Sequence, residues 1–143
     1  MLVSELMNRD VITIAPEETA SIAARLLFRR NIGSVPVCDR SGRLRGIVTD
    51  RDIALRCVAA GNDPETTPVR EIMSRCVVSC SPDDDISSAS AKMSSGQIRR
   101  LPVVENGQLV GILSLGDIAV SRQCRMEAGS ALSDISSNVR RLR

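Results

Sequence analysis

The pattern of apolar and polar positions along the chain predicts a series of short strands and helices. Residues 11–14 and 77–80 are short runs rich in apolar and β-branched side chains, each followed within two residues by a proline, which predicts two strands. Thr19 and Asp85 then stand before apolar positions at helical spacing, which predicts a capped helix after each strand. The expected buried stripes are Ile22, Ala23, Leu26 and Leu27 in the first helix and Ile86, Ala89 and Met93 in the second.

Two hairpins and two further helices are predicted after these elements. Residues 35–38 and 44–48 form a hairpin about Ser41-Gly42, and residues 101–104 pair with 109–113 about Asn106-Gly107, a strong type I′ turn sequence. The last helices begin near Asp50 and Leu115, and the apolar stripe of the first contains Ile53, Cys57 and Val58. Between the halves, residues 61–69 have the composition of a linker, and residues 69–73 predict a short helix leading into the second half.

The two halves are copies of one another. "MNRDVITIAPEET" from Met7 matches "MSRCVVSCSPDDD" 66 residues later, and "GIVTDRDI" from Gly46 matches "GILSLGDI" 65 residues later, the lost residue falling in a turn. We therefore predict an α/β (α+β) fold of two pseudo-symmetric β-α-β-β-α repeats packed through their sheets. The repeats span 1–62 and 63–127, and the tail 128–143 is either disordered or packs on a partner through Ala131, Leu132 and Ile135.

Composition limits the chemistry. The chain is 43% apolar with a net charge of +2, as in a soluble globular protein, and it shows neither a secretory leader nor a run long enough for a membrane span, so we expect a cytoplasmic protein without membrane contact. It contains no His, which excludes imidazole-based catalysis and argues against an enzyme. Phe28 is the single aromatic residue, and one ring is no platform for stacked bases, so we do not expect nucleic-acid binding.

The five cysteines contain no Cys-x-x-Cys pair, and we interpret them as small core residues of a reduced protein, with a redox role as the alternative. Residues 83–85 are a run of aspartates at a helix start, where acidic side chains favour the helix dipole. We therefore expect no metal site there.

Two recurring motifs carry candidate chemistry. In Gly-h-h-Ser/Thr-x-x-Asp, where h is apolar, Thr49 with Asp52 and Ser114 with Asp117 are spaced as helix capping boxes. The same hydroxyl and carboxylate are suited to bind a ribose diol at the positive end of a helix, so each pair is a cap, a ligand clamp, or both.

The second motif ends in a proline at the start of a strand. In "IGSVPV" and "IRRLPV", Pro36 and Pro102 remove a backbone donor, which leaves neighbouring polar groups to meet a flat heterocycle, or marks no more than a strand entry. Arg99 and Arg100 are either phosphate ligands or solvated surface.

Together these motifs, repeated in order over about residues 1–125, closely resemble a pair of cystathionine-β-synthase (CBS) domains, also called a Bateman module, of the stand-alone prokaryotic type. The resemblance implies a homodimer and two clefts between the repeats that bind adenosyl ligands such as AMP, ADP, ATP, S-adenosylmethionine or NAD. It assigns ribose contacts to Thr49 with Asp52 and to Ser114 with Asp117. The remaining implied contacts are Ile14, Ser34, Val35 and Pro36 in one site and Cys80, Arg99, Arg100, Leu101 and Pro102 in the other.

From these patterns we expect a non-enzymatic sensor without a catalytic cofactor, which binds an adenosyl small molecule as a regulatory ligand and signals to a protein partner. The alternative is a ligand-free dimerisation or scaffold module, with or without thiol sensing through a cysteine.

Overall fold

The structure is a computed structural model that describes residues 1–121 and 130–135. The chain divides into two compact units, and each is built from both halves of the sequence. Unit 1 consists of Met1–Val11 and the described residues from Val78 onward, and unit 2 consists of Ile12–Val77. The units therefore differ from the sequence repeats: the first eleven residues belong with the second copy, and residues 63–77 belong with the first.

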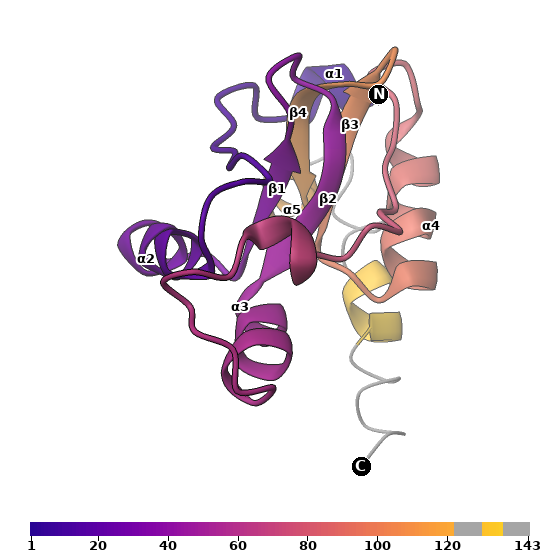
Figure 1. Ribbon diagram of the computed structural model, residues 1–143. Helices are drawn as coiled ribbons and strands as arrows, with labels where there is room; N and C mark the ends of the chain where they lie inside the picture. Colours follow the sequence, from indigo (N-terminus) through magenta and orange to yellow (C-terminus); the bar gives the residue numbers. More distant parts are fainter. Residues whose placement is uncertain (122–129, 136–143) are drawn as a thin grey trace. The chain divides into compact units, whose positions relative to one another are not determined.

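Unit 2 contains a two-stranded antiparallel sheet with helical segments before and after it (Figure 1). Thr19 accepts a bond from the Ile22 N–H and so caps α2, which confirms the predicted cap. The elements are α2 (Ala20–Arg30), β1 (Ser34–Cys38), β2 (Leu44–Thr49), α3 (Asp50–Asp52), the π-helical η1 (Ile53–Val58) and the 3₁₀ turn η2 (Val69–Glu71). The η2 turn confirms the predicted short helix, although it packs within unit 2.

Unit 1 repeats this arrangement. Asp85 caps α4 by accepting a bond from the Ser87 N–H, and Asn106 and Gly107 both have positive φ, which confirms the type I′ turn of the second hairpin. The elements are α1 (Val3–Leu6), α4 (Ile86–Gly96), β3 (Arg100–Glu105), β4 (Gln108–Ser114) and α5 (Leu115–Val120). Mixed helices and small sheets confirm the predicted fold class.

The predicted strands 11–14 and 77–80 are wrong in extent, because each is reduced to one parallel bridge, Ile14 with Val37 and Cys80 with Val103. The Ile14 N–H donates to the Pro36 carbonyl and Cys38 donates to the Ile14 carbonyl. Continuing this parallel ladder towards Ile12 would require an N–H on Pro36, which proline lacks. Pro102 has the same effect beside Cys80. Pro36 and Pro102, which we predicted at strand starts, are instead the third residues of β1 and β3. Each of them ends the parallel pairing with the segment that precedes the helix.

The repeated methionine segments pair with the other copy's hairpin. Asn8 exchanges two backbone hydrogen bonds with Ile112, and Ser74 exchanges two with Ile47. A Cβ atom on Gly111 would lie 2.7 Å from the Met7 sulfur, so only glycine leaves room for the crossing segment. The first residue of the Gly-h-h-Ser/Thr-x-x-Asp motif therefore has a packing role, which the sequence analysis did not identify.

The two units have separate cores. Ala23, Leu27 and Ile53 are buried in unit 2, but Ile22 and Val58 are exposed, so these two positions of the predicted stripes were wrong. In unit 1 all three residues of the predicted stripe, Ile86, Ala89 and Met93, are buried. Cys38, Cys57 and Cys80 are buried, as predicted for core residues, whereas Cys76 is exposed and Cys124 lies outside the described residues.

Residues 130–135 are helical, and Ala131 is part of the core of unit 1. This segment, yellow in Figure 1, lies beside α4, and a surface groove lined by serines of α4 and by Ser130 and Asp134 runs between them. Ile135 is buried and Leu132 is exposed. The rest of the predicted tail, 128–129 and 136–143, lies outside the described residues.

Candidate functional site

The first candidate site is the junction between β2 and α3, where Thr49 and Asp52 are bonded reciprocally. The Thr49 N–H donates to Asp52 Oδ2 at 3.0 Å, and the Asp52 N–H donates to Thr49 Oγ1 at 3.0 Å. Thr49 has extended backbone and ends the strand, so its side chain is free to cap the helix that follows. The capping-box prediction is confirmed, and it leaves Asp52 Oδ1 outside the box.

The second candidate site repeats this geometry between β4 and α5. The Ser114 N–H donates to Asp117 Oδ2 at 2.9 Å, and the Asp117 N–H donates to Ser114 Oγ at 3.0 Å. Each site thus presents a carboxylate that is already oriented by the backbone at a helix start. Such a carboxylate accepts hydroxyl groups well, because its geometry is fixed before a ligand arrives.

The strand pairing brings the second motif next to each box. Ser34 lies opposite Thr49 in the sheet of unit 2, and Arg100 lies opposite Ser114 in the sheet of unit 1. The loop is also bonded to the helix start, since the Asp50 N–H donates to the Gly33 carbonyl and the Leu115 N–H donates to the Arg99 carbonyl. Two motifs that are about fifteen residues apart in the sequence therefore share one end of each hairpin.

The implied base-slot residues differ in what they can offer. Val35 and Leu101 are fully buried in the cores of their units, and Pro36 and Pro102 are buried as well. The carbonyl of Pro36 already accepts the Ile14 N–H, and that of Pro102 accepts the Cys80 N–H. Ser34 is half-buried and carries a hydroxyl, so it is the residue of this end of β1 whose side chain can offer a polar contact.

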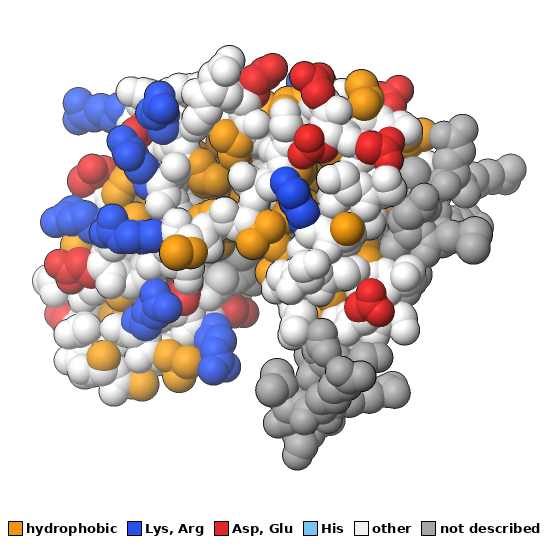
Figure 2. Space-filling view, turned by 90° about the vertical axis from the view of Figure 1, so that its right-hand side faces the viewer, with side chains coloured by type: hydrophobic (Ala, Val, Ile, Leu, Met, Phe, Trp, Pro, Cys, Tyr) orange, Lys and Arg blue, Asp and Glu red, His pale blue; other side chains and the backbone are white. Residues whose placement is uncertain are grey.

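Arg99 and Arg100 are both exposed beside the Ser114 and Asp117 box. Figure 2 shows basic side chains in blue on the surface, several of them with acidic side chains in red close by. A phosphate contact by either arginine remains a prediction.

Arg56 is a neighbour of the first site that the sequence analysis did not single out. Its Nε atom lies 3.9 Å from Asp52 Oδ1, and its Nη1 atom donates to the carbonyls of Ile72 at 3.3 Å and Met73 at 3.2 Å. Asp52 is 8% exposed. The equivalent residue of the second copy is Ser121, which carries no charge. This difference between the copies is the sequence signal that could have identified Arg56.

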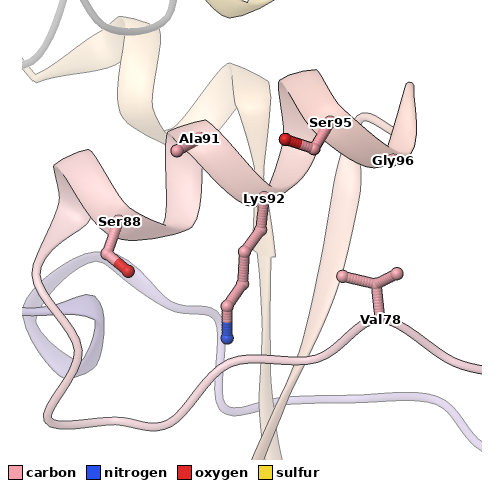
Figure 3. Close-up of a pocket in the computed structure, with 6 residues that line it drawn as sticks. All are labelled: Val78, Ser88, Ala91, Lys92, Ser95 and Gly96. Atoms are coloured by element: carbon pink, nitrogen blue, oxygen red, sulfur yellow. The ribbon is translucent and has the colours of Figure 1, made fainter.

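Two surface grooves, one in each unit, are lined by residues outside the boxes. One of about 430 Å³ lies between Val78 and α4, and Figure 3 shows Lys92 extending across it. Lys92 donates to the Ser79 carbonyl at 2.9 Å and lies 3.8 Å from Asp84. The equivalent groove of unit 2, about 380 Å³, includes Ile14 at its wall. Of the implied ligand residues, Ile14 is the one that lines either of these two grooves.

Burial favours the protonated form of two thiols, those of Cys80 and Cys38. Burial raises the pKa of Cys80 to about 11, with a further contribution from the Asp84 carboxylate that the Lys92 ammonium partly offsets. Burial also raises the pKa of Cys38, next to Asp39. Thiolates are the reactive form of cysteine, so neither Cys80 nor Cys38 is suited to redox chemistry at neutral pH.

Within residues 1–121 and 130–135, no helix is both long and apolar enough to cross a membrane. The same residues contain no group of three or more Cys, Asp or Glu side chains arranged to hold a metal ion.

Comparison with known proteins agrees with the repeated architecture. The model of the family described as "CBS domain" matches residues 3–58 and 69–121, once in each repeat. The chain belongs to the CBS domain family. It carries the domain twice, and solved CBS-domain proteins share its fold, as the sequence predicts.

Several relatives cover most of this CBS pair. The CBS domain-containing protein YhcV of Bacillus subtilis is 46% identical over 134 residues, which cover 94% of each chain. Hypoxic response protein 1 of Mycobacterium tuberculosis is 35% identical over 115 residues, covering 80% of each chain. These relatives carry family or descriptive names and no enzyme name.

Two solved structures are informative about ligands. The crystal structure of Hypoxic Response Protein I with two coordinated zinc ions superposes with a TM-score of 0.78 at 33% identity, covering 84% of this chain and 98% of that one. The CBS domain pair of protein MJ0100, solved in complex with 5′-methylthioadenosine and S-adenosyl-L-methionine, gives a TM-score of 0.72 at 30% identity, covering 91% and 98%. CBS pairs of this fold therefore include one that binds adenosyl compounds.

Proposed function

We propose that this CBS pair is a non-enzymatic sensor that binds an adenosyl ligand and passes the bound state to a protein partner. The ligand classes are AMP, ADP, ATP, S-adenosylmethionine and NAD, all of which carry a ribose. The observation that carries the proposal is the recurrence of one preoriented box, Thr49 with Asp52 and Ser114 with Asp117, at the same end of both hairpins. The adenosyl complex of the related MJ0100 pair supports the choice of ligand class.

Each box supplies the groups that a ribose needs. A carboxylate with one oxygen held by a backbone N–H still has lone pairs for the two hydroxyls of a diol, and the Thr or Ser oxygen adds a third contact. The neighbouring loop would hold the base. The residues proposed for it are Ile14, Ser34, Val35 and Pro36 in unit 2 and Cys80, Leu101 and Pro102 in unit 1, with Arg99 and Arg100 for phosphate.

The buried residues of this set have apolar or thiol side chains, so they offer apolar contact and backbone atoms. We therefore expect the base to be recognised mainly by shape and main-chain hydrogen bonds. The protein would act as a homodimer in the cytoplasm, without a catalytic cofactor and without nucleic acid.

Calorimetric titration with AMP, ATP, NAD and S-adenosylmethionine tests the proposal. Asp52→Ala and Asp117→Ala should each weaken binding at their site by about 1.5 to 3 kcal/mol, the range for hydrogen bonds to charged groups. Asp83→Ala is the matched control, because Asp83 is an exposed aspartate that belongs to neither box. Heat from none of the four compounds with the wild-type protein would overturn the proposal.

The same variants separate the cap from the clamp. If the boxes are caps alone, Asp52→Ala lowers the unfolding temperature while the remaining folded protein keeps full affinity. If they are also clamps, affinity falls at temperatures where circular dichroism shows both proteins folded.

One observation favours a second function, a ligand-free dimerisation or scaffold module that responds to oxidation. Cys76 is exposed, unlike Cys38, Cys57 and Cys80. On this alternative, oxidation forms a disulfide-linked dimer that non-reducing electrophoresis resolves, and Cys76→Ser abolishes it. A dimer band that persists in Cys76→Ser, or that never forms, argues against thiol sensing by this residue.

A further inference from the structure

The two boxes are alike in their backbone and differ in the charge beside them. In unit 2 the carboxylate of Asp52 faces the guanidinium of Arg56, with Nε and Oδ1 3.9 Å apart. The same guanidinium is also bound to the backbone, because its Nη1 atom donates to the carbonyls of Ile72 and Met73. In unit 1 the position equivalent to Arg56 is Ser121, whose side chain is too short to reach a carboxylate one helical turn away.

The oxygen that Arg56 faces is the one left over by the capping box. Oδ2 of Asp52 accepts the Thr49 N–H, so Oδ1 is the oxygen that remains for a ligand hydroxyl. Asp52 is also buried, while Asp117 is half-buried. A ribose at Asp52 must therefore compete with a cation already present, whereas at Asp117 it meets a more accessible carboxylate.

We propose that Arg56 makes the two half-sites unequal: a ribose binds first at Ser114 and Asp117, and it reaches Asp52 only by displacing Arg56. This inference rests on the proposed function, since it concerns the order in which the same two sites fill. Arg56 acts here through Asp52 and is a positioning residue.

Displacement of Arg56 has a structural consequence within unit 2. The carbonyls of Ile72 and Met73 lose their side-chain donor, and these residues directly precede Ser74, which pairs with Ile47 across β2. Occupancy of the Asp52 site would thus destabilise the Met73–Ser74 segment, and the Ser74–Ile47 hydrogen bonds would open more often. Ligand binding at Asp52 would thus alter the stability of a backbone segment that lies close to the end of unit 2 at Val77.

Calorimetry with AMP and S-adenosylmethionine on the full chain tests the order of filling. The wild-type protein should show two dissociation constants at least about tenfold apart. Asp117→Asn should remove the tighter one and Asp52→Asn the weaker one. Arg56→Met, which keeps the aliphatic stem, should tighten the weaker constant by about tenfold, while Arg40→Met, an exposed arginine of the β1–β2 turn, should change neither.

A second readout does not depend on affinity. Arg56→Met should speed hydrogen exchange at the Ser74 and Ile47 amides several-fold without altering the Asn8 and Ile112 amides, and saturating ligand should do the same in the wild-type protein. Arg56→Gln, which can still donate to one carbonyl, serves if Arg56→Met fails to fold.

The outcomes are distinct. Two equal constants in the wild type, loss of the tighter constant in Asp52→Asn, or no tightening in Arg56→Met would overturn the inference and leave the proposed function standing. Absence of any heat with both probes would overturn the two together.

Discussion

The sulfur of Met73 lies 2.9 Å from the point where a Cβ atom on Gly46 would stand, and the Ser74 carbonyl oxygen lies 2.6 Å from it. Gly46→Ala should therefore destabilise the protein by about 1 to 3 kcal/mol, the usual cost of overpacking a filled core. A flexible methionine can move aside, but the backbone oxygen is fixed by the Ser74–Ile47 pair. Urea unfolding of the variant measures the loss.

Gly116→Ala is the matched control for this substitution. The nearest atom to a Cβ on Gly116 is Ser114 Oγ at 3.7 Å, which is ordinary contact, and alanine favours a helix over glycine. This variant should be neutral or more stable by up to about 1 kcal/mol. Equal destabilisation by both substitutions would contradict the packing role of Gly46.

Ser90 is buried in α4, and within the described part of the chain its Oγ atom has no hydrogen-bond partner. A buried hydroxyl without a partner costs free energy, and alanine is also the better helix former, so Ser90→Ala should stabilise the protein by about 1 kcal/mol. The first copy already has Ala24 at this position. Thermal unfolding measures the gain, and exposed Ser88→Ala should gain only a few tenths of a kcal/mol. A loss of stability in Ser90→Ala would show that the hydroxyl is satisfied.

Gln97 ends α4 with a left-handed backbone at φ 54°, and Asn31 ends α2 with φ 52°. Side chains other than glycine are strained in this region, with asparagine tolerated best. Gln97→Gly should therefore raise stability by about 0.5 to 1 kcal/mol, and Asn31→Gly by clearly less. The comparison is made by chemical unfolding of both variants. A larger gain at Asn31 would mean that other contacts of these side chains outweigh the backbone strain.

Local signals predicted much of the fold. Thr19, Asp85 and the Asn106-Gly107 turn act within four residues of themselves, so the sequence pattern contains the whole cause of the helix starts and of one hairpin. The strand at Val11–Ile14 failed for the opposite reason. Its ladder ends because Pro36, over twenty residues later, cannot donate a hydrogen bond, and periodicity carries no such long-range information.

The repeat predicted both capping boxes, because the same spacing occurs twice. It could not predict which hairpin Met7 and Met73 would pack against. The two segments are similar in sequence, so either could fit either hairpin, and the pairing depends on the tertiary fold. Arg56 was missed because comparing two copies emphasises what they share. The difference between Arg56 and Ser121 is what sets the two sites apart.

The buried thiol of Cys80 should make stability depend on alkaline pH. Its pKa is raised from an ordinary value of 9.0 to about 11, mainly by burial. Below pH 9 the thiol is protonated in both states. Between pH 9 and 11 the unfolded chain loses this proton while the folded protein keeps it, so unfolding releases a proton and the free energy of unfolding falls as pH rises.

We expect a loss of about 1 kcal/mol between pH 8.5 and pH 10 from this group, from the free energy of a one-unit pKa difference. Urea unfolding across this range measures it. Cys80→Val should reduce the slope, because the equivalent position of the first copy is the apolar Ile14. A smaller slope should remain from Cys38, whose pKa burial also raises. An unaltered slope in Cys80→Val would show that the Cys80 thiol titrates alike in the folded and unfolded chain.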